Sequence, residues 1–117
     1  MKYALLYIES KPQFDRRNDP AFMGAWVAYI ESLRAAGIFV AGAGLQSPET
    51  ATTVSVREGK RHVHDGPYAE TKELVGGVSI IDVPNLDVAL EWAARSPAAG
   101  YGSVEVRPVL PTPPPSK

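Results

Sequence analysis

The N-terminal segment is apolar on both of its alternating faces. Every position over residues 3–8 is apolar, and Glu9 ends the run. Because successive side chains of a strand point to opposite faces, this pattern is typical of a strand covered on two sides. A helix over about residues 20–36 follows. Asp19 can cap its first turn, Pro20 suits the first helical position, and Gly37 supplies the stop.

The rest of the chain alternates between strand and helix patterns. A glycine in the turn at 58–60 predicts a β-hairpin between two short strands. The further expected elements are a strand over 38–41, hairpin strands over 52–57 and 61–64, a strand over 76–83, a helix from Asn85 to just before Pro97, and a strand over 103–107.

The order β-α-β, hairpin, β-α-β predicts an α+β ferredoxin-like (βαββαβ) sandwich with both helices on one face of the sheet. Two helices can cover only that face, although the first strand is apolar on both. We therefore expect a homodimer in which the second face of one sheet packs against the sheet of another copy.

The last strand also alternates. If Val104 and Val106 meet the helices, Glu105 and Arg107 point toward the second face. A polar-lined pocket in the dimer is then one hypothesis, and a solvated pair of charges on an edge strand is the other. Three further side chains are expected to join the pocket: Tyr3, Tyr7 and Ser79.

The composition of the chain excludes several classes of function and several kinds of site. Twelve Lys and Arg against thirteen Asp and Glu give a net charge of −1, which argues against direct nucleic-acid binding and against a polybasic membrane binder. The absence of cysteine excludes disulfides, thiolate metal sites and a cysteine nucleophile. No apolar run is long enough to span a bilayer or to form a secretory signal, so a cytoplasmic location is expected.

We expect one domain over residues 1–110 and a flexible proline-rich tail over 111–117.

The densest polar stretch is residues 62–73. Asp65, Gly66 and Pro67 are turn-forming residues, and residues 68–73 could form a single helical turn. Such a loop can bind a ligand or simply tie two strands together. The candidate ligand-binding residues of this loop are Asp65, Tyr68, Glu70, Thr71, Lys72 and Glu73.

Residues 65–73, DGPYAETKE, resemble the DGPFAETKE signature of the DGPF-domain branch of the YCII-related family. Eight of nine positions agree, and Tyr68 replaces Phe. Flanking segments are similar as well, so that the resemblance covers about residues 1–110. It implies a dimeric α+β barrel of two ferredoxin-like subunits. Proteins of this branch are largely uncharacterised, and some members are found beside extracytoplasmic-function sigma factors. The resemblance therefore implies a role accessory to sigma-factor-linked transcription regulation.

The wider family includes a dehydrochlorinase, and its proposed acid–base dyad is a His near the start of helix one and an Asp just before the glycine that ends it. Here helix one has no His, and Ala35 and Ala36 stand where the Asp would be. The dyad therefore does not carry over. The absence of this dyad from helix one argues against an enzyme.

Three hypotheses remain. His62 and His64 share a strand face and could reach one metal ion together with Asp65 or Glu70, although two histidines are a weak signal and no cofactor is expected. His64 oriented by Asp65 could serve as an acid–base catalyst of a cofactor-free lyase, isomerase or oxygenase. The favoured hypothesis is a non-catalytic module that binds a small molecule or a partner protein in the dimer cleft.

Overall fold

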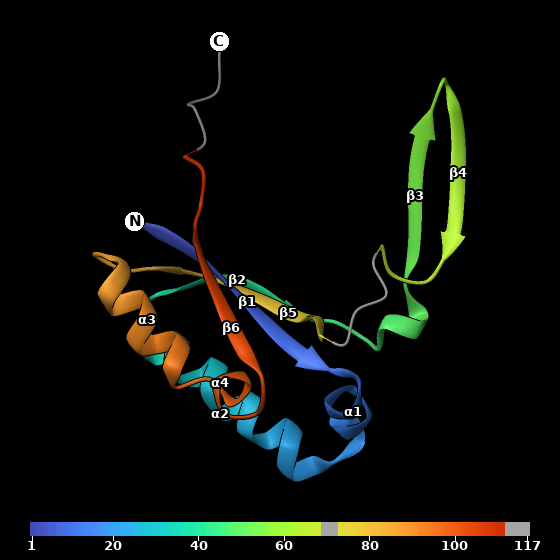
Figure 1. The fold of residues 1–117 in the computed structure, drawn as a ribbon. Helices are drawn as coiled ribbons and strands as arrows, with labels where there is room; N and C mark the ends of the chain where they lie inside the picture. The colour runs from blue at the N-terminus through green and yellow to red at the C-terminus, as the bar shows by residue number, and fades with distance from the viewer. Residues whose placement is uncertain (69–72, 112–117) are drawn as a thin grey trace.

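A four-stranded antiparallel sheet in the order β2-β5-β1-β6 forms the centre of the molecule (Figure 1). The computed structural model describes residues 1–68 and 73–111. This strand order and the helices between the strands confirm the ferredoxin-like α+β fold. The strands are β1 (Lys2–Ser10), β2 (Phe39–Gly44), β5 (Glu73–Asp82) and β6 (Ser103–Pro108).

Two helices, α2 (Pro20–Ala35) and α3 (Leu86–Ala94), begin where the sequence predicts. The Asp19 side chain accepts a hydrogen bond from the backbone N–H of Ala21 (3.0 Å), and the Asn85 side chain accepts one from Val88 (3.0 Å). These bonds satisfy N–H groups that the first helical turn leaves free. The short elements that the sequence did not predict are α1 (Lys11–Phe14), 3-10 turns at Asp15–Asn18 and Pro48–Thr50, and α4 (Pro97–Tyr101).

Both longer helices pack on one face of the sheet, here called the inner face, as Figure 1 shows. The core lies between these helices and the inner face and includes Leu5, Leu33 and Ile81, each fully buried. The opposite side of the sheet, the outer face, has no helix over it among the described residues (Figure 1). Its apolar side chains on the two central strands are Ala4, Leu6, Ile8, Val75, Val78 and Ile80.

The register of β6 against β1 settles which residues share a face. Val104 pairs with Tyr7 on the inner face, as expected, whereas Glu105 pairs with Leu6 and Arg107 with Ala4 on the outer face. The expected grouping of Tyr3, Tyr7 and Ser79 with the charged pair is wrong. Those three are buried on the inner face, because odd residues of β1 point toward the helices while odd residues of β6 point away.

The hairpin of β3 (Thr52–Arg57) and β4 (Lys60–Asp65) forms a second sheet of two strands and stands apart from the first (Figure 1). Its turn confirms the glycine signal: Glu58 and Gly59 have φ values of 52° and 75°. Two successive positive φ values give the twist that a two-residue hairpin turn needs. None of the helices in the described ranges is long and apolar enough to cross a membrane.

Candidate functional site

A cleft of about 510 Å³ lies between α2 and the inner face of the sheet. Its helix wall is mostly apolar: it is made by Phe22, Met23, Trp26, Val27 and Ile30, together with the charged side chains of Glu31 and Arg34. Glycines on β2 and β5 line the opposite wall, and because they carry no side chain they leave more space in the cleft. Small-molecule sites in proteins are commonly 300–1,000 Å³ and mostly apolar, so this cleft has the dimensions and character of one.

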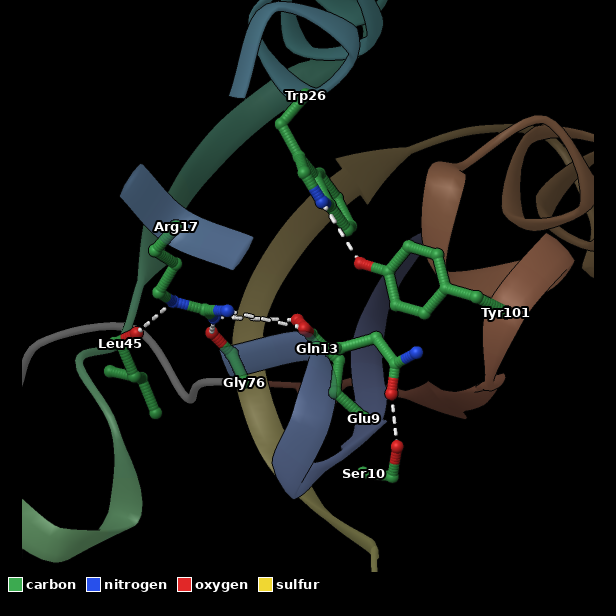
Figure 2. A network of polar contacts seen from close by, with 8 residues as sticks. All are labelled: Glu9, Ser10, Gln13, Arg17, Trp26, Leu45, Gly76 and Tyr101. Carbon is green, nitrogen blue, oxygen red and sulfur yellow. Dashed lines mark hydrogen bonds and ion pairs between the residues drawn. The ribbon is translucent and has the colours of Figure 1, made fainter. Parts of the chain in front are cut away.

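The cleft ends at a buried ion pair. The Glu9 side chain is 2% exposed, and the Arg17 side chain is 22% exposed. The guanidinium of Arg17 donates to both carboxylate oxygens of Glu9, at 3.2 and 3.4 Å. It also donates to the backbone carbonyls of Gly76 and Leu45, each at 2.9 Å (Figure 2). Arg17 thereby ties together β1, β5 and the end of β2, and it compensates the charge that Glu9 buries.

Gly76 makes room for this pair. A Cβ at that position would lie 2.7 Å from the side-chain carboxyl carbon of Glu9 and 3.0 Å from Nη2 of Arg17. Real Cβ contacts are longer than this, so any larger residue would displace the pair. By contrast, a Cβ at Gly44 on β2 meets nothing within 4 Å and would point into open space.

Tyr7 supplies an aromatic ring and a hydroxyl group at the base of the cleft. Its ring meets Trp26 edge-on at a centroid distance of 4.7 Å. Its hydroxyl donates to Oγ of Ser79 at 2.8 Å, a buried bond between neighbouring strands. Burial raises the pKa of Tyr7 above its ordinary value of 10.0. At neutral pH Tyr7 is therefore a protonated hydroxyl in an aromatic wall.

Trp26 joins this wall to α4. Its Nε1–H donates to the hydroxyl of Tyr101 at 3.0 Å (Figure 2). Burial, the largest cause, raises the pKa of Tyr101 to about 12, and the bond from Trp26 acts in the opposite direction. The indole ring is thus held in a fixed orientation beside the ring of Tyr7.

The residues predicted from the 62–73 segment lie elsewhere. His64 and Asp65 are exposed on β4, and Tyr68 is 92% exposed beyond its end. Glu73 already belongs to β5, so the expected helical turn does not extend to it. None of these residues lines the cleft beside α2. Glu70, Thr71 and Lys72 lie outside the described residues.

Of the other residues expected at a site, Tyr7 and Ser79 line the cleft. Glu105 and Arg107 form an ion pair with each other on the outer face, on the opposite side of the sheet. The two histidines of β4 share one face of the hairpin, as expected. Across residues 1–68 and 73–111, no group of three or more His, Asp or Glu side chains gathers that could hold a metal ion.

Sequence reasoning missed Glu9, Arg17 and the glycines. One signal was available: Glu9 continues the odd-numbered series 3, 5 and 7 of β1, so a carboxylate falls on the face that packs against the helices. A buried carboxylate needs a cation, and the loop that follows β1 offers two arginines, at positions 16 and 17. The glycines at 76 and 77 indicated only the start of a strand.

Comparison with known proteins agrees with the fold. The profile of the YCII-related domain matches residues 1–113. An uncharacterised protein of Rhizobium meliloti (strain 1021) is 44% identical over 61 residues, a stretch that covers 50% of this chain and 49% of the relative. The matched stretch therefore spans about half the length of that curated relative.

A solved structure is similar over nearly the whole chain. It is the 5-chloro-2-hydroxyhydroquinone dehydrochlorinase from Burkholderia phenoliruptrix AC1100 in complex with 2,5-dihydroxybenzoquinone. The TM-score is 0.54 at 17% identity, with 94% of each chain covered. At this level of identity the likeness shows a shared fold and nothing about a shared activity.

Proposed function

The chain belongs to the YCII-related family, and on that basis we propose that it is a homodimeric, non-catalytic protein that binds a small, flat, largely apolar molecule in the cleft beside α2. The observation that carries the proposal is the cleft itself, about 510 Å³ in volume, with an aromatic wall and a buried ion pair at its end. Its aromatic rings suit a planar ligand, and the hydroxyls of Tyr7 and Ser79 can orient one polar group on it.

Binding is favoured over catalysis by the state of the ionisable groups. Glu9 and Arg17 are bonded to each other, and Arg17 also bonds to two carbonyl oxygens, so their polar atoms are already engaged within the protein. The other charged pair of the lining, Glu31 and Arg34, is also paired, at 3.9 Å. The acid–base alternative would use His64 and Asp65, which lie on the exposed hairpin and do not line this cleft. The geometry therefore supports that alternative less well.

The outer face supports the proposed homodimer. Leu6, Ile8, Val78 and Ile80 form a continuous apolar surface that no helix in the described ranges covers. Exposed apolar patches of this kind mark interaction sites. A second copy related by a two-fold axis can cover this surface on both chains. The association with sigma-factor-linked regulation stays a prediction from the family resemblance.

The ligand site can be tested with Trp26 as a fluorescent reporter. The chain has two tryptophans, so Trp92→Phe leaves Trp26 alone in the cleft wall. We expect a panel of flat ring compounds (2,5-dihydroxybenzoquinone, 2-naphthol and indole) to include one that quenches Trp26 with saturation and is recovered chemically unchanged.

The matched control uses the open space at Gly44. Gly44→Leu should fill the cleft and abolish saturable quenching, whereas Gly44→Ala should leave the affinity within about twofold. Turnover of a panel member that depends on His64 would favour the enzymatic alternative. Saturable quenching that Gly44→Leu leaves unchanged would place binding elsewhere and contradict the proposal, as would no quenching by any compound.

A further inference from the structure

The β3–β4 hairpin has one apolar and one cationic face. Antiparallel partners point to the same side, so Val54 and Val63, which are directly opposite, share a face with Val56. These three residues, here called the valine face, are 60%, 57% and 60% exposed. The other side of the hairpin carries Ser55, Arg57, Lys60, His62 and His64.

A hairpin with these two faces is expected to pack its apolar face against another surface. A lone two-stranded hairpin is only marginally stable in water, and alternation of apolar and polar positions is typical of strands with one buried face. The valine face is nevertheless exposed in the chain, and the hairpin projects away from the main sheet in Figure 1. The radius of gyration is 16.3 Å, compared with about 13 Å expected for a compact domain of this length.

The size of the valine face limits what can cover it. Three valine side chains supply only a small part of the roughly 800 Å² per partner that a specific interface buries. A stable contact must therefore include a second, larger apolar surface. Among the described residues the outer face of the sheet is that surface, and the hairpin does not fold back over its own sheet (Figure 1).

We propose that the hairpin is a dimerisation arm whose valine face packs against the outer face of a second copy of this chain. This inference rests on the proposed homodimer and names the segment that holds it together. A two-fold axis places each arm on the other copy, so that two contacts form and no surface is left over. The charges are compatible: Arg61 and Asp65 lie on the same side of the hairpin as the three valines, and Glu105 and Arg107 lie on the outer face.

The cationic side of the arm then faces solvent, which provides a matched control. In sedimentation velocity at micromolar concentration we expect the wild-type chain to be a dimer. The double variant Val54→Asp/Val63→Asp should weaken dimerisation at least tenfold. Ser55→Asp/His62→Asp adds the same charges at the neighbouring cross-strand pair, on the opposite face, and should change the dissociation constant less than threefold.

Cross-linking tests the contact itself, because the chain has no cysteine of its own. Protomers carrying Val54→Cys are mixed with protomers carrying Leu6→Cys and treated with a short bismaleimide. Mass spectrometry should detect a product that joins the two variants, in excess over the product from His62→Cys and Leu6→Cys protomers.

The outcomes separate the two proposals. A wild-type dimer that both aspartate variants leave intact, with no more cross-linking from Val54→Cys than from His62→Cys, would overturn the arm and retain the dimer through the outer face. A monomeric wild-type chain would overturn both.

Discussion

Arg17 and Glu9 form the most buried ion pair described in this protein. The carboxylate, at 2% exposure, depends on a guanidinium that is itself 22% exposed. Transferring a carboxylate out of water is costly, and the arginine offsets that cost through two bonds to Glu9. The remaining donors of Arg17 reach the carbonyls of Gly76 and Leu45. The end of the cleft is therefore held by one side chain that connects three strands.

Removing that cation should be strongly destabilising. Arg17→Met leaves the Glu9 carboxylate buried without its cation, which costs about 3–5 kcal/mol in comparable sites. Urea unfolding followed by circular dichroism measures the loss. Adding Glu9→Gln to Arg17→Met should recover part of it, because the uncompensated charge is gone. Lys11→Met, which breaks an exposed ion pair with Glu49, is the control and should have little effect. An Arg17→Met variant as stable as Lys11→Met would contradict this account of Glu9.

Two glycines that line the same cleft should respond differently to one added methyl group. Gly76→Ala forces a Cβ against the Glu9 carboxyl group and should cost about 1–3 kcal/mol through displacement of the pair. Gly44→Ala meets nothing within 4 Å and should be neutral or slightly stabilising. Thermal melts of the two variants provide the comparison. Equal melting temperatures would show that the space beside Glu9 accepts an added methyl group without cost, which would contradict the prediction.

Alkaline pH should destabilise the fold partly through Tyr101. Its pKa is about 12 in the folded protein, against an ordinary value of 10.0, so the folded state holds the phenolic proton more tightly than the unfolded chain does. The stabilisation is complete below about pH 10 and is lost as the pH rises toward 12. Free energies of unfolding at pH 9, 10 and 11 should fall more steeply for the wild-type protein than for Tyr101→Phe. Parallel pH profiles would be inconsistent with the raised pKa.

A charge on the outer face should prevent the proposed dimer. Leu6 lies at the centre of that face on β1, opposite Val78 and Glu105. Leu6→Asp would bury an unpaired carboxylate in the interface, so dimerisation should weaken by a factor of about 100 or more, given a cost of several kcal/mol. Sedimentation equilibrium measures the change. Because Leu6 is outside the core, circular dichroism should show the monomer still folded. A Leu6→Asp variant that dimerises like the wild type would exclude this face as the interface.

The fold could be predicted from local signals. The caps Asp19 and Asn85, the stop at Gly37 and the glycine turn of the hairpin each act over a few residues, and the structure confirms all of them. α4 was missed because Pro97, which marks the end of the preceding helix, is also suited to begin a new one.

The candidate site was harder to predict. Arg17 contacts Gly76, which lies 59 positions away in the sequence. The residues that neighbour each of them in the sequence carry no pattern that predicts this contact. The opposite faces taken by Tyr7 and Glu105 depended on the register between β1 and β6, which the alternation within each strand does not fix. The conspicuous polar segment from His62 to Asp65 instead belongs to an exposed hairpin.

The most direct test of the proposed binding site uses the two indole N–H signals of the protein. In a ¹H–¹⁵N spectrum, Trp26 reports on the cleft wall and Trp92 on α3, and Trp92→Phe assigns them. Titration with 2,5-dihydroxybenzoquinone, 2-naphthol or indole is predicted to shift the Trp26 signal to saturation and to leave Trp92 in place. If Trp92 shifts as much as Trp26, or neither signal moves with any of the three, the cleft beside α2 is not the binding site.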